Sequence, residues 1–226
     1  MNTFKHSGGY GDLIYGLPIV IVKGGGIFYL TQRQKDNLDC LLDIQPYNIK
    51  TETLPEEEWY KKEVTINLDK FREASQTSIA HAYLDVFKVD FDLSKKWLFN
   101  VPAKEISKII IHDTGSARFP GSSIKWELLK GYEKQCIFIG YDCDYERFKK
   151  EKNLDIEWYP TKNLYEVAQV IEGSKLFLCN SSAPHAIAEA LKKYFAIDIY
   201  EGKPLYPFSR TGYVVLTRGM IERALN

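Results

Sequence analysis

Two short polar loops carry the residue types that bind anions and accept protons. The loop at 180–185 reads Asn-Ser-Ser-Ala-Pro-His and lies between an apolar run and a helical pattern. A helix beginning there would present free backbone N–H groups and the positive end of its dipole, and Ser181 and Ser182 could add hydroxyl donors. Pro184 suits the first turn of such a helix. The pattern therefore predicts a phosphate-binding loop, with an ordinary serine helix cap as the alternative.

The second loop lies near the N-terminus. Gly8, Gly9 and Gly11 form a glycine turn after a short strand pattern, and Asp12 follows at the start of a helical pattern. A carboxylate in this position can accept a proton from a reacting hydroxyl group. The alternative is a helix cap that also interacts with the helix dipole. Because open α/β sheets bind ligands at the carboxyl ends of their strands, we expect the two loops to face one another there.

The elements that must position these loops alternate between strand and helix. In the first part, the spacing predicts strands at 3–6, 27–31, 47–53 and 64–68, helices at 12–22, 34–42 and 70–88, and an exposed acidic connection at 54–62. After an irregular stretch at 90–103, it predicts strands at 108–112, 136–140, 156–159, 175–179 and 197–200, and helices at 124–132, 145–152, 164–171, 184–191 and 220–225. This alternation predicts an α/β fold with a parallel sheet covered on both faces.

Composition limits the class of protein. The 226 residues are 45% hydrophobic and 14% aromatic, which supports a sizeable core in one large or two small domains. Thirty basic and thirty acidic residues cancel, so the charge footprint of a duplex nucleic-acid binder is missing. The four cysteines are scattered, which predicts reduced thiols. We expect no membrane span, because the longest apolar run, at 13–22, is too short, and we expect a cytoplasmic protein.

Several common site signatures do not occur in the sequence. There is no HExxH or paired CxxC motif, so we expect no metal site. The glycine turn does not complete the dinucleotide fingerprint, since Ile14 stands three positions after Gly11, and a GxSxG nucleophile elbow is also absent. We therefore expect no bound cofactor and no nicotinamide dehydrogenase.

Three segments, in this order, carry a family resemblance: GDLIYGLP near the start, IIIHDTGSARFPGSSIKW in the middle and NLYEVAQVIEGSKLFLCNSSAPHAIAEAL near the end. They resemble the signature regions of the heptosyltransferase-like glycosyltransferases, family nine, of the GT-B class. The resemblance implies two Rossmann-like parallel-sheet domains facing a central cleft. It also implies an acceptor-side domain at 1–103, which includes the glycine turn, and a nucleotide-sugar donor domain at 104–226.

The resemblance also implies roles for individual residues. Asp12 would be the general base that accepts the proton of the acceptor hydroxyl. Arg118 and Lys125 would neutralise the donor phosphates, with a solvated surface pair as the alternative. The donor side would further include Ser116, Asn180, Ser181, Ser182, His185 and Glu189. A His185 packed between sheet and helix and an exposed Glu189 are the alternatives for the last two. No metal is required if helix ends and cations stabilise the departing diphosphate.

Three functions stay open at this point. The first is a glycosyltransferase that moves a sugar from a nucleotide sugar to an acceptor hydroxyl, on a glycan or even on a modified nucleic-acid base. The second is a hydrolase or epimerase of nucleotide sugars. The third is a noncatalytic nucleotide-sugar-binding module, which is favoured because Asn180, Ser181 and Ser182 stand where the family has Asp-Thr-Gly.

Overall fold

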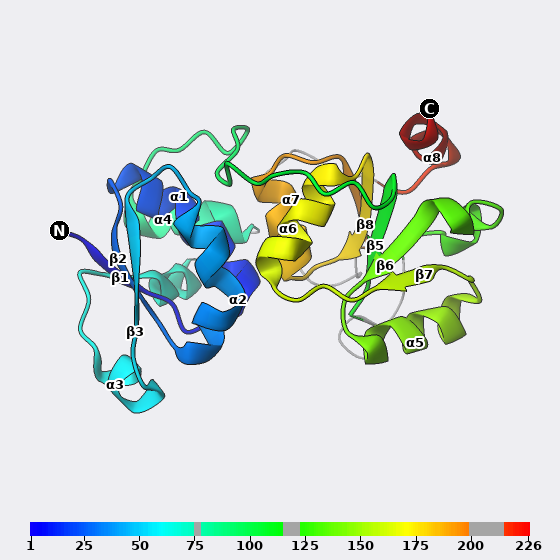
Figure 1. The fold of residues 1–226 in the computed structure, drawn as a ribbon. Coiled ribbons are helices and arrows are strands. Elements are labelled where there is room, and N and C mark those ends of the chain that lie inside the picture. Colours follow the sequence, from blue (N-terminus) through cyan, green and yellow to red (C-terminus); the bar gives the residue numbers. More distant parts are fainter. Residues whose placement is uncertain (75–77, 115–122, 199–214) are drawn as a thin grey trace.

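Two parallel β-sheets organise the chain in the computed structural model, which describes residues 1–74, 78–114, 123–198 and 215–226 (Figure 1). The first sheet has the order β3-β2-β1-β4 and contains β1 (Thr3–Lys5), β2 (Gly26–Leu30), β3 (Ile49–Thr53) and β4 (Ile66–Asn67). The second has the order β7-β6-β5-β8-β9 and contains β5 (Ile109–His112), β6 (Cys136–Ile139), β7 (Glu157–Tyr159), β8 (Leu176–Asn180) and β9 (Phe195–Asp198). Every neighbouring pair is parallel, which confirms the α/β prediction.

The two sheets share one strand order. In each, the first strand lies between the second and the fourth. The order of the strands therefore reverses at β1 in the first sheet and at β5 in the second. Ligands in open α/β folds bind outside the carboxyl ends of the strands at such a switch point. The fold therefore directs attention to the residues that follow β1 and β4, and to those that follow β5 and β8.

The helices of the first sheet are α1 (Tyr10–Val22), α2 (Gln32–Asp43), the short α3 (Glu56–Lys61) and α4 (Ile79–Phe87). The predicted exposed connection at 54–62 is wrong in part, because Trp59 of α3 is buried and its Nε1–H donates to the Tyr29 carbonyl. The predicted strand at 64–68 keeps two residues and then turns into the 3-10 helix η1 (Leu68–Glu73). This turn buries Leu68 and Phe71 in the core.

The second sheet is covered on both faces, as predicted. Ile110 belongs to the hydrophobic cluster that includes α6 (Leu164–Gly173) and α7 (Ala183–Ala190). Ile109 and Ile111 point to the other face, where they join a second cluster with residues of α5 (Asp142–Lys152) and α8 (Arg218–Leu225). The terminal helix α8 therefore packs against the second sheet.

The helix predicted at 124–132 is wrong. One 3-10 turn, η2 (Trp126–Leu129), lies in this range, and a second, η3 (Glu133–Gln135), follows it. Gly131 between them has a φ of +90°, a left-handed conformation that an α-helix cannot contain. Trp126 and Leu129 are buried nonetheless, so the apolar spacing reflects packing against the sheet rather than a continuous helix.

One hydrophobic cluster joins the two halves of the chain. It includes residues of α1, α2 and α4 from the first half and of α6 and α7 from the second, and α1 packs against α7 (Figure 1). Residues 88–108, all described, run between the halves without a helix or strand, in agreement with the irregular stretch predicted at 90–103. The domain boundary at 103 stays a prediction.

All four cysteines lie in the described segments, and none of them forms a disulfide. Within the same segments, every helix is too short or too polar to serve as a membrane-spanning segment.

Candidate active site

A pocket of about 540 Å³ receives residues from both halves of the chain. Both predicted loops line it, with Gly9, Tyr10, Gly11 and Asp12 from the first and Ser181, Ser182, Ala183 and Pro184 from the second. A Cβ added at Gly11 would lie 3.3 Å from the Cα of Ala183, which shows how closely the two backbones approach. The two loops therefore face one another, as the sequence predicts.

The helices that begin at these loops have no side-chain cap within the described residues. Gly9 is the N-cap residue of α1 and Ser182 that of α7, but the Ser182 hydroxyl donates to the Asn180 carbonyl instead (3.2 Å). In contrast, α2 and α6 also border the pocket and are capped by Thr31 and Asn163. The alternative that a serine hydroxyl simply caps α7 is wrong for Ser182. The N-terminus of α7 keeps its capacity for an anion.

Asp12 is the third residue of α1 and not its N-cap. Its side chain is 28% exposed, and its Oδ2 atom lies 3.5 Å from Nη2 of Arg72. Its Oδ1 atom makes no hydrogen bond to any described residue. Burial raises the pKa of Asp12 above its usual range, Arg72 partly offsets this, and Asp69 adds to it. A carboxylate with a raised pKa is a stronger proton acceptor near neutral pH.

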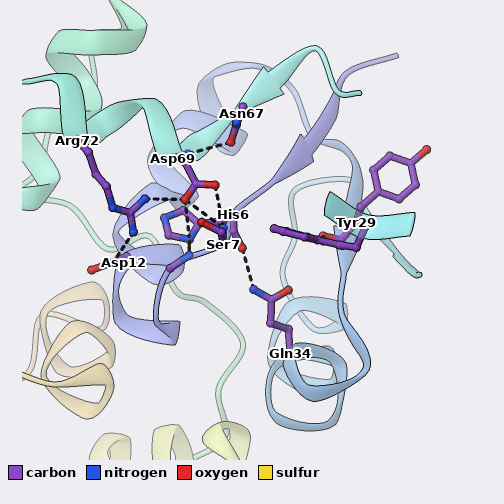
Figure 2. A network of polar contacts seen from close by, with 10 residues as sticks. His6, Ser7, Asp12, Tyr29, Gln34, Asn67, Asp69 and Arg72 are labelled. Atoms are coloured by element: carbon purple, nitrogen blue, oxygen red, sulfur yellow. Dashed lines mark hydrogen bonds and ion pairs between the residues drawn. The ribbon is translucent and has the colours of Figure 1, made fainter. Parts of the chain in front are cut away.

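Figure 2 shows the polar network behind Asp12. Both carboxylate oxygens of Asp69 accept from the Ser7 backbone N–H (3.1 and 3.0 Å), and Oδ1 also accepts from Nη1 of Arg72 at 2.6 Å. Burial would raise the pKa of Asp69, but the hydrogen bonds from Arg72 and Ser7 lower it below its usual range. Asp69 is therefore an anion that holds the Arg72 guanidinium next to Asp12.

His6 completes this network from the end of β1. The side chain is fully buried, and its Nδ1 atom accepts a hydrogen bond from the Gly8 N–H at 2.8 Å. Burial is the main reason why its pKa falls to about 4, with Asp69 opposing the shift and Arg72 reinforcing it. His6 is therefore neutral at physiological pH. Its carbonyl accepts from Nε2 of Gln34, which ties the loop to α2 (Figure 2).

A second polar group lies at the switch point of the second sheet. Nδ2 of Asn180, at the end of β8, donates to Oδ1 of Asp113 (2.9 Å) and Oγ1 of Thr114 (3.0 Å), which follow β5. Nη2 of Arg147 donates to the Asp113 carbonyl at 3.0 Å. Asn180 is buried and outside the pocket lining, whereas Thr114 and His112 line the pocket. Asn180 thus fixes the strand ends from which Ser181 and Ser182 extend.

Comparisons with known proteins rest on the fold. No family model matches the chain, and no curated protein matches it. Solved structures do match: a glycosyl transferase family 9 protein from Veillonella parvula has 13% identity over 87% of this chain and 80% of that one, with a TM-score of 0.58. The E. coli heptosyltransferase WaaC with ADP-2-deoxy-2-fluoro heptose has 12% identity over 100% and 99%, with a TM-score of 0.59.

A third match is the E. coli ADP-heptose lps heptosyltransferase II, at 12% identity over 100% of this chain and 97% of that one, with a TM-score of 0.57. The chain has a heptosyltransferase-like glycosyltransferase fold. The family resemblance of the three sequence segments is therefore confirmed for the fold.

Within this glycosyltransferase fold, His185 and Glu189 lie behind the pocket. Both side chains are fully buried, and neither belongs to the pocket lining. Nδ1 of His185 lies 3.1 Å from the hydroxyl of Tyr15, and the His185 ring meets Phe195 edge to face. Oε1 of Glu189 accepts from Nζ of Lys192 at 2.7 Å. His185 is therefore packed in the interior, as one of the two alternatives predicts. The alternative of an exposed Glu189 is wrong.

The remaining predicted residues divide into three groups. Ser116 and Arg118 lie outside the described residues. Lys125 directly precedes η2 with an exposed side chain and is not part of the pocket lining. Gly8 also lies outside the lining but packs against the Asp12 network. In the described segments, no group of three or more His, Cys, Asp or Glu side chains could hold a metal ion.

His6, Asp69 and Arg72 were not predicted from the sequence. His6 directly follows β1 and the other two belong to η1, which follows β4, so the pairing of β1 with β4 brings them together. The signal that could have found them is the strand order, since the residues after β1 and β4 meet at the switch point.

Proposed function

We propose that this protein is a glycosyltransferase that moves a sugar from a nucleotide-sugar donor to an acceptor hydroxyl. The observation that carries the proposal is that the Asp12 carboxylate and the N-terminus of α7, which no described side chain caps, line one pocket. The first provides a base for the acceptor, and the second provides N–H donors for a diphosphate. The shared fold and the ADP-sugar analogue bound by WaaC support the same substrate class.

In the proposed reaction, Asp12 is the catalytic base. The acceptor oxygen forms a bond to the anomeric carbon of the sugar as its proton passes to the Asp12 carboxylate. The bond from that carbon to the diphosphate oxygen breaks, and the nucleoside diphosphate leaves with the electron pair. The raised pKa of Asp12 favours this proton transfer, because general-base catalysis is most efficient when the pKa of the base approaches the working pH.

The donor would lie on the side of residues 104–226, opposite an acceptor-side domain formed by residues 1–103 with Gly9 and Gly11 at the pocket. Its diphosphate would meet the N–H groups of α7 and the hydroxyls of Ser181 and Ser182, with Ser116, Arg118 and Lys125 as further partners. In this scheme helix dipole and cations stabilise the leaving group without a metal ion. His185 and Glu189 would support the α7 loop from behind, as their burial indicates.

The test of this function is a panel of nucleotide sugars, first by thermal shift and then by release of nucleoside diphosphate with and without acceptor glycans. Ligands that bind the folded state raise its melting temperature. We expect one donor class to stabilise the protein and its diphosphate to be released only when an acceptor is present. Release without acceptor would instead identify a hydrolase, and tight binding without any turnover would identify a binding module.

Lys125 provides a sharper test of where the donor phosphates lie. If its ammonium contacts the diphosphate, Lys125→Ala should weaken binding of both the donor and the free nucleoside diphosphate by about 1.5–3 kcal/mol, as for a hydrogen bond to a charged group. Isothermal titration calorimetry measures this directly. Lys130, exposed at the other end of η2, provides the matched control, and Lys130→Ala should bind both ligands normally. If the two variants bind the ligands with equal affinity, Lys125 does not contact the donor phosphates.

A further inference from the structure

Two neighbours, Asp69 and Phe71, orient the guanidinium of Arg72. Its Nη1 atom donates to Oδ1 of Asp69 at 2.6 Å, and Asp69 is itself fixed by the Ser7 N–H. Its Cζ atom lies 4.6 Å from the centre of the Phe71 ring. With these contacts in place, Nη2 lies 3.5 Å from Oδ2 of Asp12 (Figure 2). A planar guanidinium held at one nitrogen and stacked on a ring keeps its other nitrogen in a defined direction.

Gly8 leaves the space in which this contact forms. A Cβ added to Gly8 would lie 2.5 Å from Nη2 of Arg72, 2.8 Å from Oδ2 of Asp12 and 2.4 Å from Cε1 of His6. Gly8 is not among the glycines with positive φ, so its role is steric and not conformational. The glycine turn is therefore built around the contact between Arg72 and Asp12.

We propose that Arg72, anchored by Asp69, is a positioning residue that holds Oδ2 of Asp12 so that Oδ1 is presented to the acceptor hydroxyl. The proposal rests on the proposed function, because it assigns Arg72 a role in the work of that base. The Oδ1 atom makes no hydrogen bond to any described residue, and Asp12 lines the pocket. Arg72 itself is outside the lining, and we assign its effect to its contact with Asp12.

Charges around Asp12 set the direction of the pH effect. The titratable groups that face it or lie on the elements packed around it are Arg72 and Asp69 of η1, Tyr83 of α4, Tyr15 of α1, neutral His6, and the buried His185 and Glu189 of α7. Arg72 lowers the pKa of Asp12, and Asp69 raises it. Loss of Arg72 should therefore raise the pKa of Asp12 further. The base would then be protonated, and inactive, at a higher pH than in the wild type.

The first experiment compares Arg72→Gln with the wild type in transfer assays across pH. We expect turnover at neutral pH to fall by up to about 100-fold, the scale of a misplaced catalytic group, while the KM for the donor changes little. The acid limb of the pH–rate profile should also move to higher pH, which a merely structural defect would not produce. Lys70→Gln removes an exposed cation from the same 3-10 helix and should leave both turnover and profile unchanged.

The Asp69→Ala variant distinguishes two ways in which Asp69 could affect the pKa of Asp12, by holding Arg72 in place or through its own negative charge. If Asp69 acted on Asp12 only through its own negative charge, its removal would lower the pKa of Asp12 and move the acid limb to lower pH. If its role is to hold Arg72, the guanidinium is released and the limb moves to higher pH, as in Arg72→Gln. We expect the second result. A shift to lower pH would overturn the anchoring role.

A measurement that needs no substrate tests the role of Arg72 independently of the proposed function. Carbon-13 NMR of labelled carboxyl groups, assigned with Asp12→Asn, follows the protonation of Asp12 directly. A wild type that transfers no sugar would refute the proposed function, whereas the NMR titration would still show whether Arg72 controls Asp12. A wild type that transfers sugar, together with an Arg72→Gln variant of unchanged profile and unchanged titration, would refute the positioning role.

Discussion

Asp12→Asn is expected to slow sugar transfer by roughly 10²–10⁴-fold, the usual contribution of a general base. The amide has nearly the shape of the carboxylate, so the side chain keeps its place at the third position of α1. It cannot, however, take up the proton of the acceptor hydroxyl. Donor affinity should barely change, because we assign the Asp12 carboxylate to the acceptor and the N-terminus of α7 to the donor diphosphate. Transfer rate and donor affinity are measured on the same sample.

Stability should respond in the opposite direction. The folded-state pKa of Asp12 is raised, so its ionised form is less favourable in the folded protein than in the unfolded chain. The free energy of unfolding therefore falls as pH rises from the unfolded pKa through the folded one. Asp12→Asn removes this loss, so its melting temperature at neutral pH should equal or exceed that of the wild type.

The control for Asp12 is an exposed acid on a neighbouring helix. Asp36 of α2 accepts a hydrogen bond from Gln32, which an asparagine can still accept, so Asp36→Asn should leave transfer and melting temperature unchanged. Near-normal transfer by Asp12→Asn would remove Asp12 from the mechanism. A large loss of melting temperature in that variant would instead indicate a structural role at the start of α1.

The two loops could be predicted because their signals are local. A strand, a glycine turn and an acid at the start of a helix identify the first loop, and serines before Pro184 identify the second. Each pattern occupies fewer than about 20 residues, and the strand-to-helix transition determines which groups lie at the carboxyl end of the sheet. The predicted residues that line the pocket are Gly9, Gly11, Asp12, Ser181 and Ser182.

The environment of Asp12 could not be predicted in the same way. Arg72 is 60 positions from Asp12, and the pairing of β1 with β4 is a long-range fact that no local spacing records. For a similar reason, the sequence does not show which face of α7 is buried. Glu189 reads as an exposed helix residue until α1 packs against α7 and Lys192 neutralises the buried carboxylate. Charged residues in cores depend on partners that only the assembled fold supplies.

Trp97→Ala should reduce the free energy of unfolding by about 3–5 kcal/mol, the range for removal of a large aromatic side chain from a core. Trp97 lies in the irregular stretch between the two halves and is fully buried. Its backbone N–H donates to the Ala190 carbonyl at the end of α7, and its ring lies beside Tyr15 of α1. A cavity here would loosen both helices that carry the site. Urea unfolding provides the measurement.

The indole N–H of Trp97 makes a hydrogen bond whose contribution to stability two further variants can measure. Nε1 donates to the Ile14 carbonyl at 3.1 Å, and that carbonyl lacks its usual helical partner because residue 18, four positions later, is a proline inside α1. Trp97→Phe keeps most of the ring but leaves the carbonyl unpaired, so it should cost about 1–3 kcal/mol. Pro18→Ala returns a backbone N–H to Ile14, so in that background the cost of Trp97→Phe should shrink. An equal cost in both backgrounds would show that the Trp97 side chain stabilises the protein by packing alone.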